Sequence, residues 1–280
     1  MPKYVLLLLA LLAVACSDKK AETTLLSAET PVAAAAPDSA AANSAAPIVP
    51  EQVPLAQLPA QLRLPGQLLE AWRWTDSQGE NMLVVFRTVT KSRQQLAAAP
   101  PDSSDVQDIE DFERSAQLTA RQYVRAGSSS YKELWRLQDA VQNCPFDMWL
   151  GPLPGATSIT DLDKDGQTET TLLYKLTCRS DVSPSGLKLI MREGAAKYAL
   201  RGQMVVAYDS GPVSERTPAN PCCLDTISQR QLNAPDGYKL VAGRYESEKE
   251  FRKAPVAFLL FARQQWQKFS IEKAEDHEQL

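Results

Sequence analysis

The segment from Thr170 to Cys178 restricts the fold of this chain more than any other part of its sequence. Apolar and mostly polar side chains alternate along it, with Leu172, Tyr174, Leu176 and Cys178 on one face and Thr171, Lys175 and Thr177 on the other. A period of two residues is that of a β-strand, and the alternation of polarity indicates one buried face and one solvent face. The chain therefore requires a β-sheet that is covered on one side at this strand.

Further strands are predicted on both sides of this segment. They comprise residues 69–74 and 81–90 around a turn at Gln78 and Gly79, residues 118–125 and 131–141 around a turn at 127–130, and residues 187–191 followed by 198–208. Each is rich in β-branched, aromatic or alternating apolar residues, and the turns contain glycine. Residues 97–111 interrupt the pattern with Ala, Pro, Ser and Asp, which predicts an exposed loop.

One helix is predicted near the carboxyl end. Residues 256–269 carry apolar side chains at helical spacing, at Phe258, Leu259, Phe261, Ala262 and Trp266, and Pro255 precedes them. Proline is favoured at the start of a helix. The expected fold class is mostly β (α+β), an antiparallel β meander or sandwich with this helix packed on the sheet. Without internal repeats, a single domain at residues 66–270 is expected, followed by a frayed tail at 271–280.

The first fifteen residues have the layout of a signal peptide that is removed. Lys3 precedes an apolar run of 11 residues at 5–15, which is too short to span a bilayer, and small residues precede Cys16. A cysteine at the first mature position resembles a lipobox, so Cys16 is the predicted lipidation site. Ser17 in place of Asp favours the outer membrane. A plain secretory signal with a coincidental cysteine is the alternative.

A disordered tether is expected between the lipidated cysteine and the domain, at residues 16–65. Residues 31–50 contain nine Ala, four Pro and two Ser, without apolar periodicity. Such a composition cannot bury a core, and the prolines interrupt any helix before it is nucleated. The formal net charge of the chain is -4, with no basic stripe, so nucleic acid is not expected as a partner.

An acidic loop at residues 161–169 has the pattern D-x-D-x-D-G-x-x-E. Asp161, Asp163, Asp165 and Glu169 offer carboxylates, the Gln167 carbonyl offers a further oxygen, and Gly166 permits a sharp turn. Leu172 stands where an EF-hand needs a bidentate Glu, so we expect a strand-flanked calcium loop with a structural role. The alternative is a metal-free turn, since Asp and Gly are common in hairpins.

Four cysteines besides Cys16 allow three disulfide pairings in an oxidising compartment. Cys144 with Cys178 is expected, because adjacent cysteines form only a strained ring with each other. For Cys222 and Cys223 the alternative is two free thiols.

Catalysis is not expected, although it is left open. The only histidine, His277, lies in the polar tail, which disfavours a Ser-His-Asp triad. Asp147 and Asp181 are possible functional residues, since they or the loop carboxylates could supply a pair for sugar chemistry.

Several motifs resemble a small bacterial family labelled surface polysaccharide biosynthesis protein. They are E-A-W at 70–72, G-E-N at 79–81, C-P-F-D at 144–147, T-D-L-D-K-D-G at 160–166, C-R-S-D-V-S-P at 178–184, L-K-L-I-M at 187–191 and K-Y-A-L-R-G at 197–202. The resemblance covers residues 68–269 and also favours the pairing of Cys144 with Cys178. It implies a link to lipopolysaccharide or capsule production.

Taken together, the expected function is that of a membrane-anchored envelope lipoprotein that binds an envelope glycan or a polysaccharide-assembly protein. The alternatives are a carboxylate-based glycan hydrolase or transferase and a structural scaffold that does not bind glycan.

Overall fold

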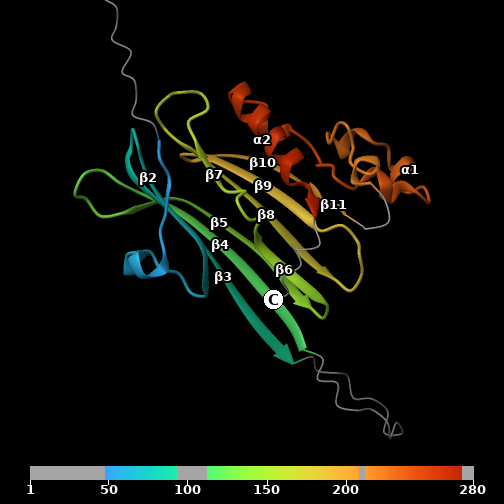
Figure 1. The fold of residues 1–280 in the computed structure, drawn as a ribbon, viewed down its shortest axis with the longest axis horizontal. Coiled ribbons are helices and arrows are strands. Elements are labelled where there is room, and N and C mark those ends of the chain that lie inside the picture. The colour runs from blue at the N-terminus through green and yellow to red at the C-terminus, as the bar shows by residue number, and fades with distance from the viewer. Residues whose placement is uncertain (1–47, 94–111, 208–211, 273–280) are drawn as a thin grey trace, which may run out of the picture. The chain divides into compact units, whose positions relative to one another are not determined.

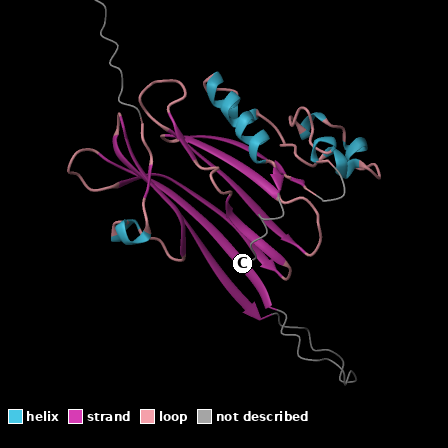
Figure 2. Ribbon diagram, in the orientation of Figure 1, coloured by secondary structure: helices cyan, strands magenta, loops and turns pink. Residues whose placement is uncertain are grey.

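The computed structural model describes residues 48–93, 112–207 and 212–272, which all belong to one compact unit at Ala45–Leu280. Strand is the most abundant secondary structure in this part of the chain (Figure 2). Two antiparallel sheets and a C-terminal helix form the fold, so the predicted class, a mostly β (α+β) protein with a terminal helix, is confirmed. Cys16, the predicted signal peptide, the predicted loop at 97–111 and His277 lie outside the described residues.

The first sheet has the order β1-β2-β3-β4-β5, and the second has the order β10-β9-β8-β6 with β7 also paired to β8 (Figure 1). The strands of the first are β1 (Glu51–Gln52), β2 (Gln67–Asp76), β3 (Gly79–Arg93), β4 (Phe112–Arg125) and β5 (Lys132–Cys144). Those of the second are β6 (Asp147–Pro152), β7 (Ser158–Thr160), β8 (Glu169–Arg179), β9 (Gly186–Glu193) and β10 (Ala196–Gln203). A small parallel pair joins β11 (Val205–Val206) to β12 (Ile271–Glu272).

The helical elements are short except for the last. They are α1 (Gln229–Leu232), α2 (Val256–Phe269) and the 3-10 turns η1 (Leu55–Gln57), η2 (Ala60–Leu62), η3 (Val213–Glu215), η4 (Leu224–Thr226), η5 (Gly237–Leu240) and η6 (Lys249–Phe251). Helix α2 has the bounds predicted from its apolar spacing. Among the described residues, no helix has the length and apolarity needed to cross a membrane.

Three hydrophobic cores hold these layers together. Residues of both sheets, such as Leu83, Leu118, Leu150 and Leu172, pack together in the first core. The opposite face of the second sheet is covered by α2 and the C-terminal turns, where Leu173, Leu189, Phe258 and Trp266 meet. The outer face of the first sheet packs on the N-terminal segment through Val53, Leu58, Leu62, Val84 and Phe86. The second sheet is therefore buried on both faces.

This double coverage corrects the prediction for the strand at 170–178. Strand β8 lies in the middle of the second sheet, with Leu172 in the core between the sheets and Leu173 in the core beneath α2. Thr171 and Lys175, which were expected to face solvent, are both buried. The prediction of one exposed face was wrong because elements far away in the sequence cover that face.

Two predicted boundaries were also wrong. Residues 48–65 were assigned to the tether, but β1 pairs with β2 and Leu58 and Leu62 are buried on the first sheet. Their prolines precede short 3-10 turns that still place leucines on the sheet. The tail was expected to fray from residue 271, but Ile271 and Glu272 form β12 beside β11.

Candidate metal centre

The acidic loop connects β7 to β8. Hydrogen bonds from its backbone amides to its own Asp side chains hold its shape. The Gly166 amide donates to Asp161 Oδ2 at 3.2 Å, and the Gln167 amide donates to Asp165 Oδ1 at 2.7 Å. Gly166 has a φ of +85°, a conformation that glycine adopts without the steric penalty of a Cβ. The glycine in the motif thus permits the turn along which the Asp side chains come close to one another.

The loop brings five carboxylates into two overlapping groups. Oxygen atoms of Asp161, Asp163 and Glu169 lie within 4.8 Å of one another, and so do oxygens of Asp163, Asp165 and Glu193. All four carboxylates predicted from the motif belong to these groups. The side chain of Gln167 accepts a hydrogen bond from Gln78. The expected ligation by the Gln167 backbone carbonyl is a separate matter and stays a prediction.

Glu193 is the member of the cluster that the sequence motif does not contain. It ends β9 and is the register partner of Glu169 at the start of β8. Directly opposed residues of an antiparallel pair project to the same side of the sheet, which places both carboxylates next to the loop. The two strands were predicted from the sequence, but their register was not, and the register alone adds this residue.

Burial and mutual repulsion raise the pKa of two of these carboxyl groups. Burial raises the pKa of Glu169 to about 7, and the charge of Asp163 adds to this effect, although Thr160 and the Leu162 amide donate hydrogen bonds to Glu169. Burial and the three Asp side chains of the loop also raise the pKa of Glu193. The cluster therefore carries more negative charge than its surroundings stabilise.

Two oxygens of the cluster lack hydrogen-bond partners among the described residues. Asp161 Oδ1 and Glu193 Oε1 are both buried as atoms, and neither accepts a hydrogen bond. Buried carboxylate oxygens are normally satisfied, and a hard cation satisfies several of them at once. A donor set made only of oxygens matches the preference of calcium, so the residues fit the expected ion.

The loop is also attached to the first sheet, at the turn between β2 and β3. The Ser77 amide donates to the Gly166 carbonyl at 2.9 Å. The Thr168 hydroxyl donates to Asp76 Oδ2 at 2.7 Å and accepts a hydrogen bond from Trp74 Nε1 at 2.8 Å. The position of the cluster is therefore fixed by both sheets.

Asp147 and Asp181 lie at the other end of the second sheet. Asp147 begins β6 opposite Arg179, the last residue of β8, whereas Glu169 is its first. The length of β8 separates them from the loop by roughly 33 Å, at about 3.3 Å per residue. Asp181 is exposed and its pKa is lowered by hydrogen bonds with Ser183. These two residues cannot act together with the acidic loop.

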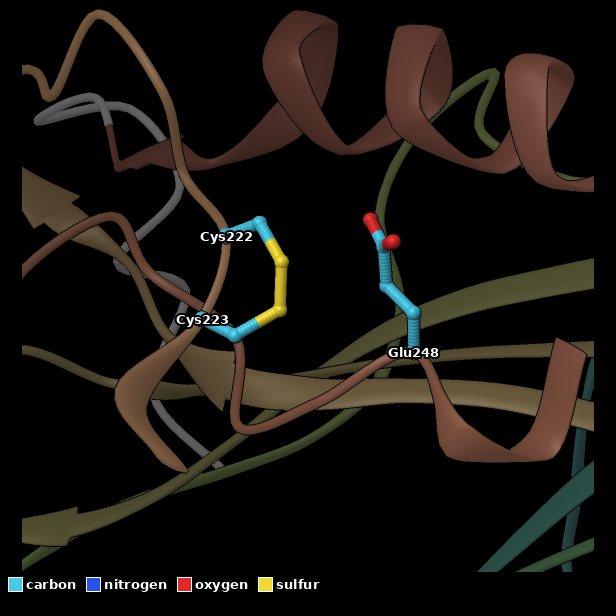
Figure 3. Close-up of side chains that lie close together, drawn as sticks. All are labelled: Cys222, Cys223 and Glu248. Carbon is cyan, nitrogen blue, oxygen red and sulfur yellow. A yellow bond between two sulfur atoms is a disulfide. The ribbon is translucent and has the colours of Figure 1, made fainter. Parts of the chain in front are cut away.

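Two disulfides lie within the described part of the chain. Cys144 at the end of β5 is joined to Cys178 in β8, which is the expected pairing and links the two sheets. Cys222 and Cys223, whose pairing the sequence left open with two free thiols as the alternative, are bonded to each other. Figure 3 shows this pair facing Glu248. Because Arg263 donates two hydrogen bonds to that carboxylate, this trio is not a cation site in the oxidised protein.

The acidic loop with Glu193 is thus the candidate site that the geometry supports. Its oxygens converge, two of them lack a protein donor, and both sheets hold it in place. Comparison of the chain with protein-family models, with curated proteins and with solved structures found no match.

Proposed function

We propose that the protein is an envelope lipoprotein, anchored through Cys16 to the outer membrane, whose β sandwich is stabilised by calcium in the acidic loop. In this role it binds an envelope glycan or a protein that assembles surface polysaccharide. The lipobox supports the anchor, and the motif resemblance supports the link to polysaccharide. The convergence of the loop carboxylates with two unsatisfied buried oxygens is the observation that carries the calcium site.

Calcium would act on stability rather than on signalling. Extracellular calcium modules bind with dissociation constants of about 0.1 to 1 mM. At 1 mM calcium such a site stabilises the folded state by about 0.4 to 1.4 kcal/mol. Because Gly166 and Thr168 bond to the β2–β3 turn, the ion would also strengthen the junction between the sheets.

Binding is favoured over glycan hydrolysis because the carboxylates outside the loop are too far from it. A glycosidase needs two carboxyl groups roughly 5 to 9.5 Å apart on either side of the scissile bond. Asp147 and Asp181 stand at the opposite end of β8, and the loop carboxylates are grouped around a common point. The hydrolase and scaffold alternatives are separated from binding by the experiments below.

The calcium site is tested by thermal unfolding of the purified protein in EDTA and in 1 mM calcium. We expect the midpoint to rise by about 1 to 5 °C, given the stabilisation above and the size of the domain. An Asp163→Ala, Asp165→Ala double variant should lose this rise. An Asp225→Ala, Asp236→Ala double variant removes the same charge from exposed positions away from the loop and should keep it. Equal responses of the two variants would refute the site.

The glycan role is tested by incubating the protein with surface polysaccharide extracted from the producing cells. Retention of the polysaccharide without new products supports binding. Release of shorter products would establish the hydrolase instead. If neither occurs, and no assembly protein is captured by cross-linking in the envelope, the remaining function is that of a structural scaffold.

The anchor is tested separately with a Cys16→Ser variant. The wild-type protein should incorporate radiolabelled palmitate, and the labelled protein should be recovered in the outer-membrane fraction. The variant should take up no label and should be found in the soluble fraction. If the wild-type protein takes up no label, the lipid anchor is refuted and residues 1–15 act as a plain secretory signal.

A further inference from the structure

Two cysteines and a carboxylate meet among the C-terminal turns that cover the second sheet. The sulfur atoms of Cys222 and Cys223 and a carboxylate oxygen of Glu248 lie within 4.8 Å of one another. Figure 3 shows the two sulfurs turned toward Glu248. Cys222 is partly exposed, whereas Cys223 is buried. Two potential soft ligands and one hard ligand therefore converge at the edge of this core.

Tyr245 holds both parts of this cluster in place. Its amide donates to the Pro221 carbonyl at 3.1 Å, and its carbonyl accepts from the Leu224 amide at 2.9 Å, so these hydrogen bonds bracket the two cysteines. Its hydroxyl donates to Glu248 Oε1 at 2.6 Å. None of these bonds uses a sulfur atom. We therefore expect the cysteines to stay beside Glu248 when their disulfide is reduced.

The charge of the cluster depends on its redox state. In the oxidised protein Arg263 offsets the charge of Glu248 through hydrogen bonds of 2.7 and 2.6 Å. Reduction followed by the loss of two thiol protons adds two negative charges, which match the charge of a divalent cation. With the bond from Tyr245, Glu248 accepts three hydrogen bonds. A carboxylate has about four lone-pair sites, so one is left for a metal ion.

We propose that the reduced Cys222–Cys223 pair binds zinc, with the two thiolates and Glu248 as ligands and Arg263 holding the carboxylate in position. Zinc accepts thiolate and carboxylate ligands, and the ligand atoms around a tetrahedral zinc ion are about 3.3 to 3.8 Å apart. The three side chains need only small movements to reach this spacing. The disulfide closes the site, because the thiolate is the form of cysteine that ligates a metal.

Opening the site requires a dithiol reductant. A thiolate of the reductant attacks the sulfur of Cys222, the more exposed cysteine, and the sulfur of Cys223 leaves as a thiolate. The second thiol of the reductant then displaces Cys222. The reductant leaves as a disulfide after giving two electrons and two protons, and the protein gains two thiols. Zinc binding releases the two thiol protons to solvent.

The test uses the full chain with Cys16→Ser, so that thiols arise only from the four other cysteines. The protein is reduced with dithiothreitol, freed of the reductant without air, and titrated with cobalt and then with zinc, beside the oxidised protein. We expect a thiolate-to-cobalt charge-transfer band in the near ultraviolet for the reduced protein only, and one equivalent of zinc should remove it. The acidic loop offers only oxygen atoms, so cobalt bound there gives no such band.

Two cysteine variants show which pair binds the metal. Cys222→Ser, Cys223→Ser should abolish the band. Cys144→Ser, Cys178→Ser, which removes the disulfide between the sheets, should keep it. The comparison of oxidised with reduced protein does not depend on the folding of either variant.

The role of the carboxylate is tested with Glu248→Gln, which should weaken cobalt binding at least about tenfold. Glu246→Gln removes the same charge from an exposed position nearby and should leave binding unchanged. Equal binding by these two variants would refute the three-ligand site. The whole proposal is overturned if dithiothreitol frees no thiols at Cys222 and Cys223 in the folded protein, if the reduced protein gives no band, or if the band persists in Cys222→Ser, Cys223→Ser.

Discussion

Lys175 Nζ lies 3.2 Å from Glu272 Oε1 in a position where the two side chains are 1% and 0% exposed. Arg179 Nη2 donates to the same oxygen at 2.8 Å, and the Ser185 hydroxyl donates to it at 2.9 Å. Lys175 also lies 5.0 Å from the centre of the Trp149 ring. The last described residue is thus fixed to a central strand of the second sheet by one buried cation, Lys175, and one nearly buried cation, Arg179.

Replacement of Glu272 by Gln should destabilise the protein by about 3 to 5 kcal/mol. The amide keeps the shape of the side chain but removes its charge, which leaves Lys175 and Arg179 buried without their common anion. Urea unfolding measures the loss. The control is Glu51→Gln, which breaks the exposed pair with Arg73 and should cost at most about 1 kcal/mol. Equal losses in the two variants would contradict a buried ion pair.

The same network predicts how stability depends on pH. Burial by itself would raise the pKa of Glu272, but the charges of Lys175 and Arg179 outweigh it and hold the pKa below its ordinary value of 4.5. A carboxyl group with a lowered pKa contributes stability that is present above its unfolded pKa and is lost as the pH falls through the folded pKa. The difference in unfolding free energy between wild type and Glu272→Gln should therefore be constant above pH 5.5 and shrink below pH 4.5. A difference in unfolding free energy that stays constant down to pH 3 would refute this pH dependence.

The burial of Lys175 could not be predicted from its own strand. Alternation of polarity reports one buried face only when the other face meets water, and here α2 and β12 cover that face. The partner of Lys175 is 97 residues away in the sequence. The β2–β3 hairpin, the β4–β5 hairpin and helix α2 were predictable because turn glycines, alternation and helical spacing are local signals.

The candidate site, too, could be predicted only in part from local sequence patterns. The D-x-D-x-D-G spacing identifies the loop, since the chelating residues are neighbours in the sequence. Glu193 comes from another strand, and its place opposite Glu169 depends on the register of β8 with β9. The attachment of the acidic loop to the β2–β3 turn likewise depends on contacts between the two sheets, which no local pattern specifies.

Removal of the disulfide between Cys144 and Cys178 should cost about 3 to 4 kcal/mol, because it closes a long loop with a sequence separation of 34. A Cys144→Ser, Cys178→Ser double variant measured by urea unfolding checks this value. A Cys222→Ser, Cys223→Ser double variant is the matched control. That bond joins sequence neighbours, so it restrains the unfolded chain far less. A larger loss in the control than in the first variant would show that loop closure is not the source of the stabilisation.

Thr168→Val tests the attachment of the acidic loop to the first sheet. The buried Thr168 hydroxyl joins Trp74 Nε1 to Asp76, and valine of similar shape leaves both groups without this partner. We expect a loss of about 1 to 3 kcal/mol, which is the cost of unsatisfied buried polar groups. Faster hydrogen exchange at the Ser77 amide, which donates to Gly166, should accompany it. Thr226→Val removes a hydroxyl bond at an exposed turn and should cost less than about 1 kcal/mol. If the Ser77 amide exchanges at the wild-type rate in Thr168→Val, the loop is held to the first sheet without the threonine.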